Sequence, residues 1–103
     1  MKHFHRTHAH PDAVLVAADQ FFPAIGMHQT ATSLRQRSWE GVVGAPDERV
    51  SLTLNVKMDG GHYTFIEAHT SATGESRLDR NVKKFFAQLH RQAEPGNALA
   101  AAY

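Results

Sequence analysis

The sequence predicts an α+β fold. We expect a two-layer β-α-β-β-β-β-α domain whose curved antiparallel sheet is covered by two helices, the C-terminal one long. Two segments, residues 11–25 and 74–92, carry apolar side chains at helical spacing. Residues 49–58 instead alternate apolar and polar side chains, which is typical of a strand with one buried face. Two striped helices need one apolar sheet face to cover, and an antiparallel sheet provides it.

Length and composition indicate one ordinary globular domain. The 103 residues suffice for a single domain, which we expect over residues 1–92. We expect the Ala-rich residues 93–103 to form a flexible or docking tail. The hydrophobic share of 42% and the charged share of 20% are typical of soluble proteins.

Several classes of function are disfavoured. The chain has no cysteine, which excludes disulfides, thiolate metal sites and cysteine nucleophiles. It shows no signal peptide and no apolar run long enough to cross a membrane, so we expect a cytoplasmic protein with no membrane partner. The net charge of +1 argues against nucleic acid as a partner, because nucleic-acid-binding domains usually carry a clear basic excess.

The N-terminal part predicts a strand followed by a helix. "KHFHRTHA", residues 2–9, is a short strand with polar side chains on both faces. The helix over residues 11–25 begins at Pro11, directly after a histidine in the N-cap position. Pro23 predicts that the last turn kinks or ends early, and Gly26 that the chain leaves the helix there. The apolar stripe of this helix is Val14, Leu15, Ala18, Phe21, Phe22 and Ile25.

Four strands are expected next. Residues 28–36 and 37–43 form either two strands or one long strand with a bulge, because their alternation is weak. Residues 49–58 and 62–70 then form a hairpin around the turn "DGG". The predicted core face of its first strand is Val50, Leu52, Leu54, Val56 and Met58.

The C-terminal helix, over residues 74–92, repeats the helical pattern of the first. Its apolar stripe is Leu78, Val82, Phe85, Phe86 and Leu89. Four cationic side chains lie mostly elsewhere on it, and we interpret them as a solvated face rather than a phosphate clamp. They are Arg77, Arg80, Lys83 and Lys84.

This element order, over about residues 2–92, resembles the helix-grip arrangement of START-like (Bet v 1-type) domains. It also resembles one repeat of the TATA-binding-protein-like fold. Both resemblances are carried by the order of elements rather than by a residue motif. Members of the START-like group commonly hold apolar ligands between sheet and helix, so the resemblance implies a small apolar ligand there.

The length of the hairpin turn decides which residues of its second strand face the core, because side chains alternate between the two faces. A two-residue turn places Tyr63, Phe65, Glu67 and His69 with the core face of the first strand. A three-residue turn places Thr64, Ile66, Ala68 and Thr70 there instead. We favour the two-residue turn, because Asp-Gly suits it and two aromatic rings bury more apolar area.

In this register Glu67 and His69 need polar partners, and as neighbours on one face they can pair with each other. We consider three interpretations of Glu67 and His69. The favoured one is that they are polar groups at the end of a strand, and the second is that they polarise a bound ligand. The least favoured is a catalytic pair with His69 as general base. The ligand site predicted from these considerations lies under the C-terminal helix. Its residues are Tyr63, Phe65, Glu67, His69, Phe85 and Leu89.

Two other motifs carry less weight. The histidines of "HFHRTHAH" fall on opposite strand faces, His3 and His5 on one, His8 and His10 on the other. We therefore expect solvated side chains and no metal site. "RQRSW" places Arg35, Arg37 and Trp39 on one face of a strand. We expect either that an arginine stem packs along the Trp39 indole or that these residues contact a partner.

We accordingly expect a binding module that holds a small apolar ligand between sheet and C-terminal helix, without a cofactor. The alternative is a non-enzymatic interaction protein that forms a homodimer through its sheet edge or outer face, because open sheet edges must be covered or blunted. No combination of nucleophile, base and orienting group can be named, which argues against an enzyme.

Overall fold

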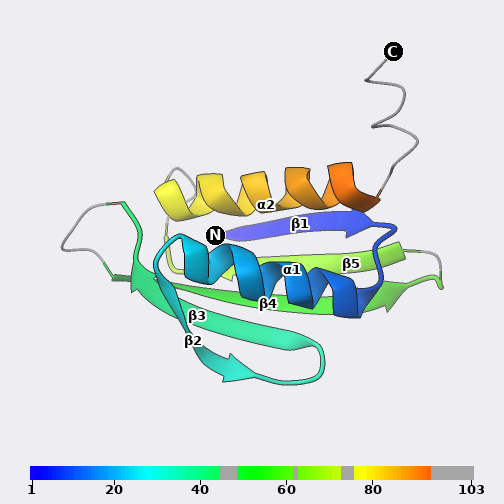
Figure 1. The fold of residues 1–103 in the computed structure, drawn as a ribbon, viewed down its shortest axis with the longest axis horizontal. Coiled ribbons are helices and arrows are strands. Elements are labelled where there is room, and N and C mark those ends of the chain that lie inside the picture. The colour runs from blue at the N-terminus through cyan, green and yellow to red at the C-terminus, as the bar shows by residue number, and fades with distance from the viewer. Residues whose placement is uncertain (45–48, 62, 73–75, 94–103) are drawn as a thin grey trace, which may run out of the picture.

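The structure is a computed structural model that describes residues 1–44, 49–61, 63–72 and 76–93 (Figure 1). It confirms the α+β class and the order of elements. Residues 94–103, most of the expected tail, lie outside the described residues, as does the expected start of the second helix at residue 74. The elements are β1 (Lys2–Thr7), α1 (Pro11–Ala24), β2 (Met27–Thr32), β3 (Gln36–Val42), β4 (Arg49–Asp59), β5 (Tyr63–Thr70) and α2 (Arg77–Ala93).

The ends of α1 are set by local chemistry, as the sequence indicates. His10 is the N-cap, and its Nδ1 accepts a hydrogen bond of 3.2 Å from the Asp12 amide. Pro11 follows in the first turn, where a missing N–H costs nothing. Pro23 lies in the last turn, and the chain leaves the helix through Gly26, whose φ of 99° favours glycine.

The five strands form one antiparallel sheet in the order β1-β5-β4-β3-β2. The two helices lie over the same face and contact each other (Figure 1). α1 packs on β2, β3 and β4, whereas α2 packs on β1 and β5. No described helix lies over the other face of the sheet. Strands β2 and β3 are separate, and β2 contains the irregularity between Gln29 and Ala31.

The register of the β4–β5 hairpin contradicts the favoured two-residue turn. Leu54 pairs with Ala68, Val56 with Ile66, and Asp59 with Tyr63, so three residues separate the strands. Ile66 and Ala68 are therefore completely buried, while Tyr63 and Phe65 lie on the uncovered face. Gly60 and Gly61 both have positive φ, 64° and 75°, a conformation that glycine adopts without steric cost.

The reason for this register lies in what else fills the core. The helices and β3 already supply large rings, with Phe22 5.0 Å from Trp39 and 5.2 Å from Phe85 between ring centroids. On the other face, Phe65 stacks on Phe4 at 5.7 Å and so gains an apolar neighbour without entering the core. The aromatic area of the hairpin alone therefore does not decide the register, because rings outside the hairpin occupy the core and the other face.

Trp39 is not the partner contact that is one of its two expected roles. Its side chain is only 1% exposed and belongs to the core. Its Nε1 has no hydrogen-bond partner in the part of the chain that the structure describes. Arg37, on the same strand, turns to α1, where its Nε lies 3.3 Å from an oxygen of Asp19. Arg35 likewise pairs with Asp12 at 3.2 Å.

Gly41 permits the close approach of β3 to the turn before β2. A Cβ atom at this position would lie 2.6 Å from the Gly26 carbonyl oxygen and 3.0 Å from the Met27 Cα. Both contacts are with backbone, which cannot move aside as a side chain can. We therefore expect Gly41→Ala to lower the free energy of unfolding by about 1–3 kcal/mol, the usual cost of overpacking.

Urea denaturation followed by circular dichroism measures this loss. Gly60→Asn is the control, because no atom lies within 4 Å of a Cβ there and asparagine tolerates its positive φ. A Gly41 variant as stable as the Gly60 variant would contradict the close approach.

Candidate functional site

The structure does not bring the six predicted ligand-binding residues together. Phe85 and Leu89 belong to α2, on the side that faces the sheet, and are 0% and 2% exposed. Tyr63, Phe65 and the Glu67–His69 pair belong to the opposite face of the sheet. The layer between sheet and α2 is filled by side chains of the chain itself, with the apolar stripe of α2 at most 8% exposed.

Glu67 and His69 pair with each other, as their spacing indicates. The distance from His69 Nε2 to Glu67 Oε1 is 2.9 Å, and the two side chains are 36% and 30% exposed. They are therefore partly solvated groups on the uncovered face and need no partner inside the core.

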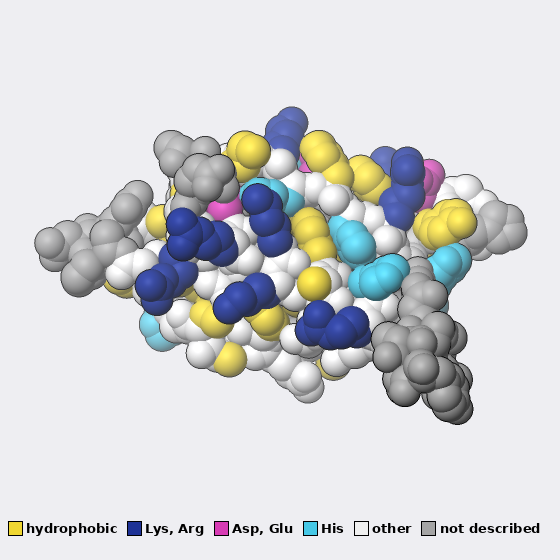
Figure 2. Space-filling view, turned by 90° about the horizontal axis from the view of Figure 1, so that it is seen from above, with side chains coloured by type: hydrophobic (Ala, Val, Ile, Leu, Met, Phe, Trp, Pro, Cys, Tyr) yellow, Lys and Arg dark blue, Asp and Glu magenta, His cyan; other side chains and the backbone are white. Residues whose placement is uncertain are grey.

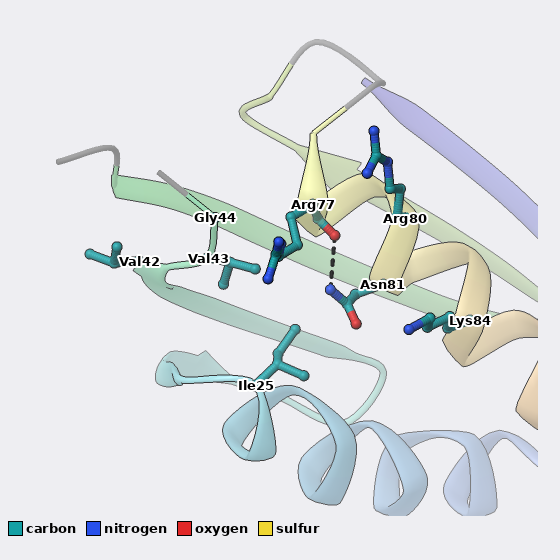
Figure 3. A pocket seen from close by; sticks show the side chains of 8 residues that line it. All are labelled: Ile25, Val42, Val43, Gly44, Arg77, Arg80, Asn81 and Lys84. Atoms are coloured by element: carbon teal, nitrogen blue, oxygen red, sulfur yellow. Dashed lines mark hydrogen bonds between the residues drawn. The ribbon is translucent and has the colours of Figure 1, made fainter. Parts of the chain in front are cut away.

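A cavity of about 500 Å³ lies instead where the two helices and the end of β3 converge (Figure 3). This volume falls within the range of small-molecule sites. The end of α1 and the chain around the end of β3 supply its apolar part, and the N-terminal half of α2 its polar part. The described lining residues are Ile25, Val42, Val43, Gly44, Arg77, Arg80, Asn81 and Lys84.

The polar side of this cavity is cationic. Arg77, Arg80 and Lys84 recur at three- and four-residue spacing, so they share one side of α2. In Figure 3 Arg77 and Lys84 extend toward the space between α2 and Ile25, whereas the head group of Arg80 turns outward. Asn81 lies between them and donates a hydrogen bond of 2.8 Å to the Arg77 carbonyl oxygen. No carboxylate is among the described lining residues.

The cations of α2 differ from those elsewhere in the chain. Six of the eleven Lys and Arg residues lie outside α2, and four of these pair with carboxylates, namely Arg6, Arg35, Arg37 and Arg49. The five on α2 are exposed, and none forms an ion pair within the described ranges; they are Arg77, Arg80, Lys83, Lys84 and Arg91. Figure 2 looks onto this side of the molecule and shows Lys and Arg gathered there with few carboxylates.

The single carboxylate of α2 is turned inward. Asp79 is fully buried and lies 2.7 Å from His3 Nε2 on β1. It also accepts hydrogen bonds from the Thr70 and Ser76 hydroxyls, at 2.8 and 2.6 Å. The Ser76 hydroxyl in turn accepts from the Asp79 amide at 3.1 Å and so satisfies a free N–H of the first turn. Asp79 therefore anchors the N-terminal half of α2 while leaving the outer side of the helix without a carboxylate.

His3 and His5 are not the solvated strand residues that we expected, whereas His8 and His10 are exposed. His3 reaches Asp79, and the His5 ring stacks on Phe86 with centroids 4.9 Å apart. Both belong to the face of β1 beneath α2. Among the residues that the structure describes, no group of three or more potential ligands could hold a metal ion.

The sequence contains part of the signal for the cavity. The cations were visible on one helix, but their lack of partners depends on which carboxylates lie nearby in the fold. The apolar residues of the cavity gave no signal, because they come from two other segments. No described helix is long and apolar enough to cross a membrane.

Comparison with protein-family models and with curated proteins finds no match for this chain. Its function is therefore argued from the site itself.

Proposed function

We propose that the protein is a binding module for a small amphipathic anion, held in the cavity between α1, the end of β3 and α2. The observation that carries the proposal is that the cations of α2 form no ion pair within the described residues, whereas four of the six cations outside α2 do. The head group of such a ligand, a phosphate or a carboxylate, supplies a negative charge to them. Its apolar body lies against Ile25 and Val43.

The helix-grip resemblance of the element order supports the same kind of function. The START-like group commonly holds apolar ligands between sheet and helix, and the cavity lies at one end of that layer. Here the space directly under α2 is taken by Phe85 and Leu89. The proposed ligand therefore lies at one end of the layer between the sheet and α2 rather than within it, and it is amphipathic rather than wholly apolar.

The first test is an NMR titration of the full chain with hexyl phosphate. We expect the amide signals of Val43, Asn81 and Lys84 to shift with a single saturating curve. Inorganic phosphate, which lacks the apolar body, and hexanol, which lacks the charge, should each bind more weakly. Equal binding of hexanol would contradict the role given to the cations.

Variants on α2 sharpen this test. Lys84→Gln and Arg77→Gln should each weaken the binding of hexyl phosphate by about three- to tenfold, as expected for one charged contact at a partly exposed site. Arg91→Gln is the matched control, because it removes the same charge from the same helix but lies outside the cavity lining. A similar loss in all three variants would indicate a general charge effect and would overturn the site.

A further inference from the structure

The face of the sheet opposite the helices carries an aromatic cluster that no described element covers. Phe4 of β1 is 56% exposed and Tyr63 of β5 is 43% exposed. The ring of Phe65 stacks on that of Phe4 at an interplanar angle of 17°. The Arg6 guanidinium and the Lys57 ammonium lie 5.6 and 5.5 Å from the Phe65 ring centroid. Aromatic residues and arginine are the types enriched at protein interfaces.

The charges on this face alternate along the strands. Around the aromatic cluster, the register of β4, β5 and β1 gives four successive rows on this face. The first has a formal charge of −1, the second +2, the third −1 and the fourth +1, with histidine taken as neutral. The rows are Asp59–Tyr63, Lys57–Phe65–Arg6, Asn55–Glu67–Phe4 and Thr53–His69–Lys2.

We propose that this face binds the same face of a second copy of the chain. The two copies would be related by a two-fold axis that lies between the two sheets and runs perpendicular to the strands. This axis passes between the second and third rows, so it reverses the order of the rows in the second copy. The second row, with Lys57 and Arg6, then opposes the third row, with Glu67, of the other copy. The first row, with Asp59, likewise opposes the fourth, with Lys2. Opposing rows then carry net charges of opposite sign, and the two central rows contain the rings of Phe4 and Phe65.

The alternative two-fold axis, parallel to the strands, is disfavoured. It would place each row against the same row of the second copy, so that Lys57 and Arg6 would meet their own equivalents. Like charges in apposition disfavour an arrangement. The ion pairs within one copy do not prevent the favoured arrangement, because Arg6–Asp59 is exposed and Glu67–His69 is partly exposed, so both can exchange partners.

The size of the face fits a dimer of moderate affinity. The five strands are 6 to 11 residues long, so at about 3.3 Å per residue and 4.8 Å between strands they give a face of roughly 600 Å². A standard interface buries about 800 Å² on each partner. The second copy must therefore use most of the sheet face, and the aromatic cluster alone is insufficient. We expect a dissociation constant in the micromolar range.

Sedimentation velocity of the full chain, from about 1 to 200 μM, tests the proposal because this range brackets a micromolar equilibrium. We expect a monomer at the low end and a dimer at the high end. Phe4→Glu should raise the dissociation constant at least tenfold. Val16→Glu is the control, because Val16 has the same exposed fraction of 56% but lies on α1. A monomer throughout, or a dimer that Phe4→Glu leaves intact, would overturn the proposal.

A charge exchange tests the direction of the axis. Glu67→Lys alone should weaken the dimer, and the triple variant Glu67→Lys, Lys57→Glu and Arg6→Glu, which reverses the charge of both central rows, should restore it to near the wild-type dissociation constant. Failure of the triple variant to restore the dimer would overturn the proposed arrangement of rows. Circular dichroism confirms that each variant is folded. Lys84→Gln, in the cavity, should leave the assembly unchanged, so this result is separate from the test of anion binding.

Discussion

Replacing Asp79 with alanine should remove about 3–5 kcal/mol from the free energy of unfolding, the usual cost of breaking a buried ion pair. A domain of this size is stable by roughly 5–15 kcal/mol, so the variant should unfold at a much lower urea concentration. The reason is the number of groups that depend on this carboxylate. His3, Thr70 and Ser76 all contact it in a site closed to water.

The cost arises because the partners remain after the carboxylate is removed. A buried donor without an acceptor loses its hydration and gains nothing in return. Removing His3 as well should recover part of the loss, so His3→Ala and Asp79→Ala together should cost less than the sum of the two. We expect a coupling of about 1–3 kcal/mol, measured by a double-mutant cycle under urea denaturation.

Two controls separate the buried contact from the loss of one acidic residue near a helix start. Asp12→Ala removes an acidic residue from the first turn of α1, but its side chain is 67% exposed, so the loss should stay below about 1 kcal/mol. Ser76→Ala removes a cap and should cost about 1 kcal/mol. If Asp79→Ala were no worse than Asp12→Ala, the buried network would contribute little to stability.

The elements of this fold could be predicted because local chemistry determines them. The helical spacing of Leu78 and Val82, the alternation over residues 49–58 and the Pro11 start of α1 are each properties of a short segment. The covering of one sheet face by two helices follows from their apolar stripes. These features required no knowledge of which distant residues meet.

The network and the cavity could not be predicted in the same way. His3 and Asp79 are 76 positions apart, and the sequence indicates neither as the partner of the other. The cavity joins the end of α1, the end of β3 and α2. The cations of α2 look like any solvated helix face until the fold shows that none of them pairs with a described carboxylate, whereas Arg35 and Arg37 pair with carboxylates on α1.

The hairpin illustrates how a local argument fails when distant neighbours decide the outcome. Within the hairpin alone, Tyr63 and Phe65 offer more apolar area than Ile66 and Ala68. The rest of the core, however, is not empty. Phe22, Phe85 and Trp39 already occupy it, and the aromatic residues of β5 find neighbours on the other face. Three residues in the turn then shift every side chain of β5 to the face opposite that expected.

Ile66→Ala and Phe65→Ala therefore form a direct test of the register. Ile66 is fully buried beneath the helices, so its truncation should cost about 2–5 kcal/mol. Phe65 lies half-buried on the uncovered face, and we expect the loss there to stay below about 1.5 kcal/mol, the upper end for an aromatic pair and its flanking cations.

The measurement is urea denaturation at low protein concentration, so that self-association through the uncovered face does not add to the stability of Phe65. The two positions are adjacent on one strand, and strand propensity differs little between isoleucine and phenylalanine. A difference in the cost of truncation then reports which side chain faces the core. A larger loss for Phe65→Ala than for Ile66→Ala would favour the two-residue turn, and with it a sheet whose inner face contains Glu67 and His69.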